Sequence, residues 1–260
     1  MKLETITQSR QSGNRSERHA AKLSGSVQYQ RYQARLEIRP TAIVLDIDGT
    51  LVPWRDYDYV WQFILSDFVL VEWNRCTLAA PGEGIISYGA WHKRLFERMR
   101  DRCITRSELV DSMRHQLAMT PRHMRAVRQL RGLAPLAVLS GSISLALEVA
   151  GFSLDWFSVL GCHHLNFDED GHIVSWTTFE HGGHFEKPAG LREICQRLGV
   201  LPRDVVYVGD GFNDREILRY VAGEGGLSFA LPPLAWTQEA WACGAISIEN
   251  LESVVRWLQN

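Results

Sequence analysis

Cysteine, long apolar runs and a strong excess of one charge are all scarce in this chain of 260 residues. Its five cysteines are odd in number and form no C-x-x-C pair, so neither a disulfide framework nor a zinc ribbon is indicated. No apolar run approaches the length of a membrane span, and the N-terminus lacks the hydrophobic block of a signal peptide. We therefore expect a cytoplasmic protein with no membrane partner.

The formal net charge is only −2, and it is unevenly distributed. Residues 1–40 hold eight Lys or Arg against three Glu, which leaves the rest of the chain acidic. An acidic body argues against nucleic acid as the main partner. Residues 1–40 are also rich in Gln, Ser, Arg and Gly, which predicts a disordered basic extension with a short helix around 27–36, although such a tail could instead contact an acidic partner.

The first sequence feature with chemical content is an apolar run over residues 42–45 that ends on two acids, Asp46 and Asp48. A continuous run of this kind is typical of a strand covered on both faces of a parallel sheet, and Gly49 ends it. Side chains two apart on an extended segment point the same way, so both acids can serve one site. In open α/β sheets the ligand crevice lies beyond the carboxyl ends of the strands.

Residues 53–120 differ from the rest because aromatic and charged side chains recur there at helical spacing. The segment from Thr105 to Glu108 has the form of a helix capping box, and residues 81–84 (Pro-Gly-Glu-Gly) predict a break between helices. We expect a small helical insertion. Its tryptophans are interpreted as insertion core rather than as ligand platforms, although one or two near the mouth of the site could line a substrate: Trp54, Trp61, Trp73 and Trp91.

An α/β pattern resumes after the insertion. Strands are predicted at 136–139, 205–208, 227–230 and 245–248, and helices at 124–130, 187–198, 215–222 and 251–258. Residues 167–175 predict a β-hairpin that turns at Asp170 and Gly171. The nearby histidines lack a ligand spacing with cysteines or acids and are interpreted as surface or hairpin residues: His163, His164, His172, His181 and His184. The fold class is therefore α/β, with a Rossmann-like parallel sheet flanked by helices and a helical cap inserted after the first strand.

Polar groups also stand at three other ends of the predicted strands and helices. Ser140 and Gly141 lie where a strand meets a helix, a turn whose hydroxyl and backbone N–H groups can hold an anion. Lys187 begins the helix at 187–198, and Asp210 and Asp214 follow the strand at 205–208. Two more carboxylates at the same sheet edge are hard oxygen ligands or supports for them.

In their order along the chain, these groups resemble the haloacid dehalogenase superfamily. Its phosphatases carry Asp-x-Asp-Gly-Thr, then Ser or Thr, then Lys, then Gly-Asp-x-x-x-Asp, and the match here covers residues 41–232. The helical insertion directly after the first motif and the form Gly-Asp-Gly-x-Asn-Asp resemble the phosphoserine-phosphatase-like branch. The resemblance implies a catalytic core of residues 41–52 and 121–260 and a cap of residues 53–120.

The resemblance also implies a mechanism. Asp46 would attack phosphorus and form an aspartyl-phosphate, which splits one difficult displacement into two. Asp48 would protonate the leaving oxygen and later deprotonate the attacking water. Mg²⁺ would be held by Asp46, the backbone carbonyl of Asp48 and Asp210, and it would offset the repulsion between two anions.

The remaining residues would bind the phosphoryl group or support those that do. Ser140 and the N–H of Gly141 would bind phosphoryl oxygens, and Lys187 would add positive charge. Asn213 and Asp214 would orient Lys187 or metal-bound water, and Asn213 is also placed with the phosphate-binding groups.

The substrate is expected to be a small phosphorylated metabolite, because a closing helical cap could not enclose a large one. Arg55 stands roughly where phosphoserine phosphatases carry a glutamate, which puts phosphoserine in doubt. Arg55 could contact a substrate carboxylate or second phosphate, or only an acid of the cap. A phosphotransferase or phosphomutase, and a non-catalytic binding protein of the same fold, stay open as alternatives.

Overall fold

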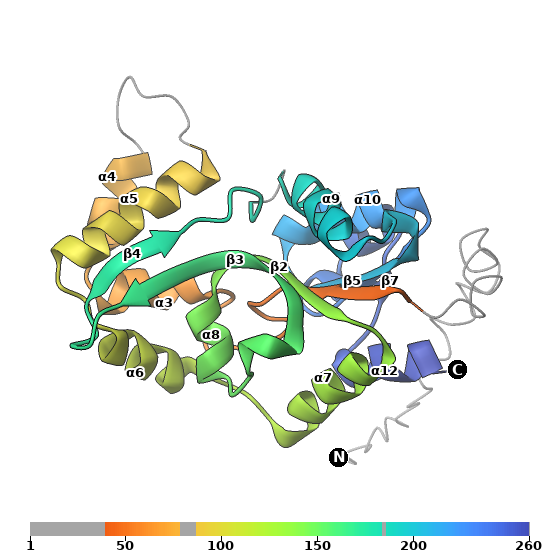
Figure 1. The fold of residues 1–260 in the computed structure, drawn as a ribbon. Helices are drawn as coiled ribbons and strands as arrows, with labels where there is room; N and C mark the ends of the chain where they lie inside the picture. The colour runs from red at the N-terminus through yellow and green to blue at the C-terminus, as the bar shows by residue number, and fades with distance from the viewer. Residues whose placement is uncertain (1–39, 79–86, 184–185, 260) are drawn as a thin grey trace, which may run out of the picture. The chain divides into compact units, whose positions relative to one another are not determined.

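A computed structural model describes residues 40–78, 87–183 and 186–259. Its central sheet has seven strands in the order β4-β3-β2-β1-β5-β6-β7 (Figure 1). The strands are β1 (Ala42–Leu45), β2 (Leu136–Ile143), β3 (Phe157–Phe167), β4 (Ile173–Thr177), β5 (Val205–Gly209), β6 (Leu227–Ala230) and β7 (Ile246–Ser247). Neighbouring strands are parallel except for β3 and β4, which are antiparallel. The predicted α/β class with a mostly parallel sheet is confirmed, and β1 spans the predicted residues.

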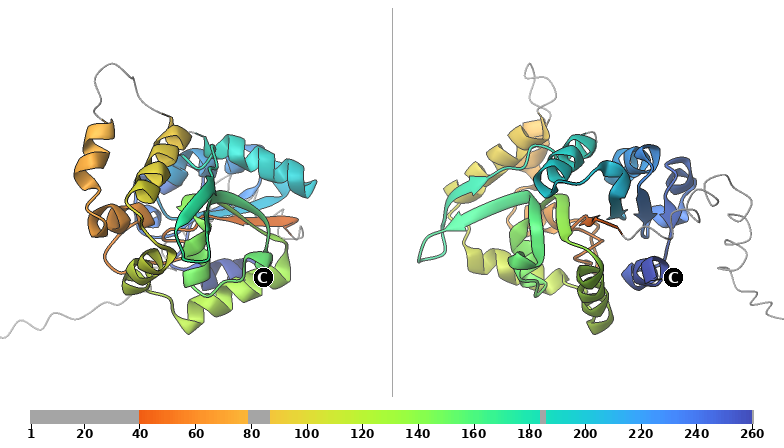
Figure 2. Two further views of the ribbon diagram at one scale, coloured as in Figure 1. Left: turned by 60° about the vertical axis from the view of Figure 1, so that its left-hand side comes forward. Right: turned by 45° about the vertical axis from the view of Figure 1, so that its right-hand side comes forward.

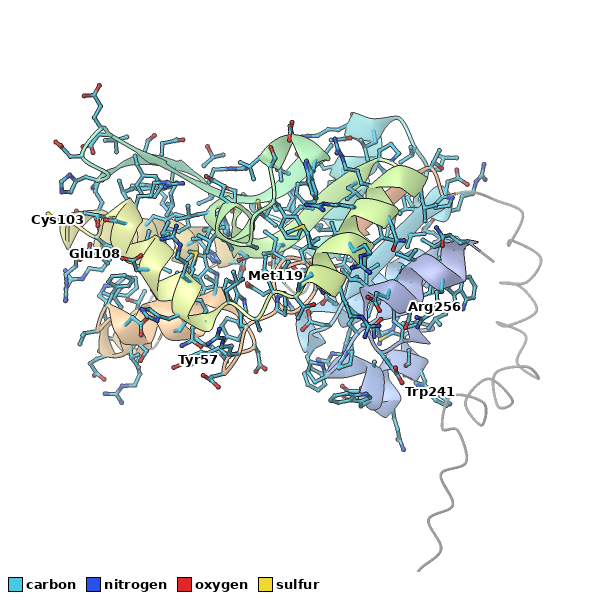
Figure 3. All side chains as sticks on the ribbon, turned by 90° about the horizontal axis from the view of Figure 1, so that it is seen from below. Tyr57, Cys103, Glu108, Met119, Trp241 and Arg256 are labelled. Carbon is cyan, nitrogen blue, oxygen red and sulfur yellow. The ribbon has the colours of Figure 1, made fainter. Side chains whose placement is uncertain are left out.

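Helices cover both faces of the sheet because alternate side chains of each buried strand point to opposite sides. In β1, Ile43 and Leu45 enter one hydrophobic core, and Ala42 and Val44 enter the other. The first core includes side chains of α7 (Pro121–Leu133) and α12 (Leu251–Gln259), which lie beside each other (Figure 1 and Figure 3). The second includes side chains of α9 (Lys187–Leu198) and α10 (Arg215–Glu224).

Local sequence signals explain where several helices begin and end. Helix α6 (Arg106–Gln116) starts at the predicted capping box, with the Thr105 hydroxyl accepting from Glu108 N–H and the Glu108 carboxylate accepting from Thr105 N–H. Helix α9 begins at Lys187 and ends at Gly199, as predicted. The shorter helices are α8 (Ser144–Val149), α11 (Gln238–Ala242), η1 (Leu154–Trp156), η2 (Pro202–Asp204), η3 (Phe212–Asp214) and η4 (Leu234–Trp236). Within the described ranges, no helix combines the length and the apolar character that crossing a bilayer requires.

In the segment predicted to be a helical insertion, the described residues (53–78 and 87–120) form four helices: α3 (Val60–Asp67), α4 (Val71–Leu78), α5 (Tyr88–Asp101) and α6. Its two connections to the core hydrogen-bond to each other, because Arg55 N–H donates to Gln116 O at 2.8 Å and Ala118 N–H donates to Pro53 O at 2.9 Å. The predicted break at 81–84 and the predicted N-terminal extension, apart from Pro40, lie outside the described residues.

Strand β3 has two roles that the sequence analysis did not separate. Its first half pairs in parallel with β2, and its second half pairs with β4 in the predicted hairpin, whose turn has Gly171 at φ +84°. The hairpin extends from the sheet to lie beside α5 (Figure 2). It is also joined to α6, because Arg106 N–H donates to Gly171 O at 2.8 Å. Strand β2 is longer than predicted and runs through Ser140 to Ile143, since its pairing with β3 resumes at Ile143 and His163 after an irregularity.

Candidate active site

Asp46 lies at the carboxyl end of β1 and is buried. Its Oδ1 accepts from Ile47 N–H at 2.8 Å, and its Oδ2 accepts from Lys187 Nζ at 2.7 Å. Burial raises the pKa of Asp46 to about 6, although the charge and hydrogen bond of Lys187 act in the opposite direction. The carboxylate is therefore held in one orientation at the strand end, next to a cation.

Lys187 is fully buried and bridges two carboxylates. Its Nζ lies 2.7 Å from Asp46 Oδ2 and 2.5 Å from Asp214 Oδ1, and the Tyr207 hydroxyl also donates to Asp214 Oδ1 at 2.6 Å. Burial lowers the pKa of Lys187, but the charges of Asp214 and Asp46 outweigh it, so the pKa is raised overall. The lysine thus stays charged inside the protein, opposite the carboxylate at the end of β1.

Asp210 joins this group from the carboxyl end of β5. Its Oδ1 accepts from the Thr50 hydroxyl at 3.1 Å, and the N–H groups of Asp210 and Gly211 donate to Asp214 Oδ2 at 3.1 and 3.0 Å. Gly49 has φ +70°, and a Cβ there would lie 2.0 Å from Asp210 Oδ2, so only glycine lets the two strand ends approach this closely. Burial raises the pKa of Asp210 well above its ordinary value, and Asp214 adds to the effect.

Three buried carboxylates, those of Asp46, Asp210 and Asp214, offer oxygen atoms within 4.8 Å of one another. Only one ammonium group, that of Lys187, bonds to this cluster among the described residues. Asp214 accepts from two donors at each of its oxygens, whereas Asp46 accepts from one backbone N–H and Lys187, and Asp210 from the Thr50 hydroxyl, which makes Asp46 and Asp210 the better candidates to hold a cation. A cluster of hard oxygen donors with excess negative charge fits Mg²⁺, and the backbone carbonyl of Asp48 stays the predicted third ligand.

Asp48 is held by two side chains that the sequence analysis did not assign to the site. The Trp54 indole N–H donates to Asp48 Oδ1 at 2.8 Å, and the Ser142 hydroxyl donates to the same atom at 3.1 Å. Burial and the nearby charge of Asp46 raise the pKa of Asp48 to about 7, while these two donors act to lower it. A carboxyl group with this pKa can give and take a proton near neutral pH.

Ser140 and Gly141 lie at the irregularity in the β2–β3 pairing, between Leu139 and Ile143. Ser140 is buried, and its Oγ accepts from Ser142 N–H at 3.2 Å. Its hydroxyl also makes a hydrogen bond that lowers the pKa of the neighbouring Asp46 carboxyl. The predicted phosphate-binding hydroxyl therefore stands next to the predicted nucleophile.

Two predicted site residues are exposed. Asn213 is exposed in η3, and its predicted contact with phosphate stays a prediction. Arg55 is exposed, and its Nε donates to Leu117 O at 3.1 Å across the base of the insertion. This bond gives Arg55 a structural role at the connection between insertion and core, and its predicted contact with substrate stays a prediction.

The structure brings to the site several residues to which the sequence analysis assigned no role there. They are Thr50, Trp54, Trp61, Tyr88, Ser142 and Tyr207. The interpretation of the tryptophans as core is confirmed for Trp54 and Trp61, which are buried, and their indole N–H groups also donate to Asp48 and to Gly141 O. The sequence signals for these residues were the place of Thr50 within the first motif and of Trp54 shortly after it.

A pair of buried histidines connects the insertion with the hairpin. The rings of His92 and His163 stack with centroids 4.0 Å apart, and both residues are fully buried. His163 is therefore a hairpin residue, as one reading of the sequence had it, but it is not on the surface. Burial lowers the pKa of His92 to about 3 and that of His163 to about 2, so both rings are neutral at physiological pH.

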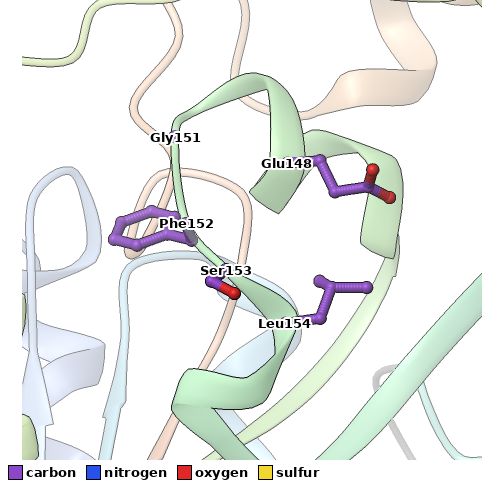
Figure 4. Close-up of a pocket in the computed structure, with 5 residues that line it drawn as sticks. All are labelled: Glu148, Gly151, Phe152, Ser153 and Leu154. Atoms are coloured by element: carbon purple, nitrogen blue, oxygen red, sulfur yellow. The ribbon is translucent and has the colours of Figure 1, made fainter.

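The surface also carries a pocket of ≈ 510 Å³ away from the motifs. It lies between α8 and η1 (Figure 4). Its lining residues are Glu148, Gly151, Phe152, Ser153 and Leu154. None of the predicted site residues lines it, so the candidate site is defined by the strand ends.

Solved structures with similar folds include several phosphatases. A substrate-bound phosphoserine phosphatase complex matches with a TM-score of 0.54 at 18% identity, over 85% of this chain and 99% of the other. A HAD family hydrolase from Salmonella enterica serovar Typhi matches with a TM-score of 0.61 at 13% identity, over 90% and 82%. A probable phosphoserine phosphatase from Vibrio cholerae matches with a TM-score of 0.57 at 20% identity, over 84% and 64%. At these identities the matches show a shared fold.

The family comparison goes further than the fold. The haloacid dehalogenase-like hydrolase family model matches residues 40–221, which include every predicted catalytic, phosphate-binding and metal-binding residue described above. The chain is a member of the haloacid dehalogenase-like hydrolase family.

Proposed function

We propose that this hydrolase is a Mg²⁺-dependent phosphatase that acts on a small phosphomonoester through an aspartyl-phosphate at Asp46. The observation that carries the proposal is the buried bridge in which Lys187 joins Asp46 to Asp214. It holds a carboxylate in place at a strand end, beside a permanent positive charge. A phosphoryl group drawn to that charge would meet the Asp46 carboxylate.

In the first step, an Asp46 oxygen attacks phosphorus, and the bond from phosphorus to the ester oxygen breaks. Asp48, in its carboxylic acid form, gives its proton to the departing oxygen. The raised pKa of Asp48, about 7, supports this role because a substantial fraction is protonated at neutral pH. Bound Mg²⁺ would supply the charge that lets an anionic carboxylate approach an anionic phosphate.

In the second step, Asp48 has become a carboxylate and takes a proton from a water molecule. That water attacks the phosphorus of the aspartyl-phosphate, and the bond between phosphorus and Asp46 breaks, which releases phosphate. The Ser140 hydroxyl and the N–H of Gly141 donate to phosphoryl oxygens in both steps. Lys187 offsets negative charge beside Asp46 throughout.

The proposed substrate is small because the insertion contacts the phosphate-binding turn directly. The Trp61 indole N–H and the Tyr88 hydroxyl, from α3 and α5, both donate to Gly141 O. The space above this turn is therefore bounded by the insertion. A free phosphorylated metabolite suits such a site better than a phosphorylated macromolecule does.

The direct test measures phosphate release from p-nitrophenyl phosphate and from a panel of small phosphomonoesters, with Mg²⁺ and with EDTA. We expect release that needs Mg²⁺, and we expect Asp46→Asn to abolish it while the far-ultraviolet circular dichroism spectrum is unchanged. Asp56→Asn, which alters an exposed acid near the same motif, is the matched control and should retain activity.

Two results would contradict the proposal. Turnover by Asp46→Asn would exclude Asp46 as the nucleophile. No release from any ester, by a folded protein that binds Mg²⁺, would favour a phosphotransferase, a phosphomutase or a non-catalytic binding protein of the same fold.

A further inference from the structure

One backbone carbonyl, that of Gly141, receives two hydrogen bonds from the helical insertion. The Tyr88 hydroxyl of α5 donates to Gly141 O at 2.8 Å, and the Trp61 indole N–H of α3 donates to the same atom at 2.9 Å. Both lengths are typical of well-formed bonds. Two helices of the insertion therefore meet the core at a single atom of the predicted phosphate-binding turn.

The close approach needs glycine at this position. A Cβ on Gly141 would lie 1.5 Å from the Tyr88 hydroxyl oxygen, so any larger residue would displace the tyrosine. Burial raises the pKa of Tyr88 well above its ordinary value, and the charges of Asp48 and Asp46 add to the effect. The hydroxyl therefore keeps its proton and stays a donor.

The carbonyl of Gly141 and the N–H of Ser142 belong to one planar amide group. In a trans peptide the two bonds point in opposite directions, so fixing the oxygen also fixes the direction of the N–H. That N–H donates to Ser140 Oγ at 3.2 Å. By fixing Gly141 O, the Tyr88 hydroxyl and the Trp61 indole N–H thus also fix the direction from which Ser142 N–H donates to the Ser140 oxygen.

The direction of the Ser140 proton follows from this bond. An oxygen that accepts from Ser142 N–H turns its own proton to the other side, and the Ser140 hydroxyl is among the groups that bond to Asp46 and lower its pKa. A phosphoryl group on or near Asp46 would meet the same proton. Hydrogen bonds and one amide group therefore connect the insertion, through the turn, to the Ser140 hydroxyl beside the predicted nucleophile.

We infer that Trp61 and Tyr88 are positioning residues, which orient the Ser140 hydroxyl for phosphoryl transfer by holding the Gly141–Ser142 amide group. The inference rests on the proposed phosphatase function. It adds to that function a dependence of the rate of phosphoryl transfer on the contact between the insertion and Gly141. Neither aromatic residue needs to touch the substrate, because each acts through the amide group.

The test uses Tyr88→Phe and Trp61→Phe in the full chain, with p-nitrophenyl phosphate and Mg²⁺. Each variant removes a donor and keeps an aromatic ring, and each should lower kcat about tenfold, as the loss of one oriented hydrogen bond in the transition state does. KM should change less than about threefold, because the binding of the ground state depends less on the developing charge.

Matched control variants separate this role from packing in the insertion. Tyr57→Phe removes the hydroxyl of a half-buried tyrosine whose ring packs on Phe63, and Trp73→Phe shortens a half-buried tryptophan of α4 (Tyr57 is labelled in Figure 3). Among the described residues, neither side chain bonds to Gly141 or stacks on Trp61 or Tyr88. Their kcat should stay within about twofold of the unaltered protein.

A second readout needs no turnover. Orthovanadate resembles the transition state more than phosphate does, so titration calorimetry should show weaker orthovanadate binding to Tyr88→Phe, in parallel with kcat, and little change for inorganic phosphate. The same comparison is then made in Ser140→Ala. There Tyr88→Phe should have no further effect on kcat, because the hydroxyl that Tyr88 positions is absent.

The outcomes separate the inference from the proposed function. If the unaltered protein releases phosphate but Tyr88→Phe and Trp61→Phe behave like their controls, the inference is wrong and the phosphatase proposal stands. The same holds if Tyr88→Phe lowers kcat equally with and without Ser140→Ala. If the unaltered protein shows no Mg²⁺-dependent release of phosphate at all, the proposed function is wrong. The inference is then wrong as well, because it rests on that function.

Discussion

Replacing Lys187 with methionine should destabilise the protein strongly, and by an amount that depends on pH. Methionine retains most of the volume and removes the charge. The ammonium group lies 2.7 Å from Asp46 and 2.5 Å from Asp214, and all three side chains are at most 4% exposed. Without it, two buried carboxylates lose their common cation, and breaking a buried pair in this way costs about 3–5 kcal/mol.

The protein can limit the cost by binding a proton instead. From an ordinary carboxyl pKa of 3.8, protonating one of the two acids costs about 5 kcal/mol at pH 7.5 and about 2 kcal/mol at pH 5.5. In Lys187→Met the folded state therefore binds more protons than the unfolded state. The destabilisation should shrink as the pH falls from 7.5 towards 5.5.

Urea denaturation followed by tryptophan fluorescence measures this effect. The free energy of unfolding of Lys187→Met and of the unaltered protein would be compared at both pH values, in EDTA and again with Mg²⁺. Mg²⁺ should restore part of the lost stability, since a cation at Asp46 replaces some of the missing charge. Lys93→Met, at an exposed position of α5, is the control and should change stability by less than about 0.5 kcal/mol.

Equal stability of Lys187→Met and the unaltered protein in EDTA at pH 7.5 would refute this reasoning. A loss that grows as the pH falls would also refute it, because the two carboxylates would then not be the source.

Three further predictions concern other contacts of the site and its surroundings. Ser142→Ala removes a donor that favours charged Asp48, so the pKa of about 7 should rise and the pH profile of kcat should shift upward by about half a unit. The neutral rings of His92 and His163 each lower the free energy of unfolding as the pH falls below 6.5, because only the unfolded state gains protons at these side chains, whereas the raised pKa values of Asp46 and Asp48 act in the opposite direction. His163→Phe removes one of the histidine contributions, so in urea titrations its free energy of unfolding at pH 5.5, relative to pH 6.5, should be about 1 kcal/mol more favourable than that of the unaltered protein. Gly49→Ala, strained at φ +70°, should abolish Mg²⁺ binding in calorimetry, and unchanged binding would show that the turn tolerates a Cβ.

The parts of the fold that local signals determine were predictable from the sequence. Residues 42–45 form β1 as predicted because a continuous branched apolar run suits a doubly covered strand. The capping box at Thr105 and the glycine at position 199 mark helix ends through contacts within a single turn. The start of α9 at Lys187 is also marked locally, because proline, which is favoured in the first turn of a helix, stands at the next position.

The convergence of the acids was predictable as well, since parallel strands place their carboxyl ends at one edge of the sheet. Asp46 and Asp210 follow neighbouring strands, β1 and β5, and their carboxylates lie in one cluster. Topology alone brings them together.

The contacts between the insertion and the core could not be predicted in this way. Trp61 and Tyr88 lie far from Gly141 in sequence, and no periodicity indicates which indole or hydroxyl reaches which carbonyl. The burial of His163 depends on the packing of α5 against a hairpin, which hydropathy does not encode. The positioning role inferred for Trp61 and Tyr88 rests on such tertiary contacts, which the motifs in the sequence do not contain.

Covalent labelling of Asp46 tests the central claim most directly. The protein would be mixed with a turned-over phosphomonoester and Mg²⁺, quenched in acid and reduced with borohydride, which converts an aspartyl-phosphate to homoserine. Mass spectrometry of the peptides then locates the change. The account predicts conversion at Asp46 in the unaltered protein, and steady turnover with no conversion, or with conversion at another acid, would contradict it.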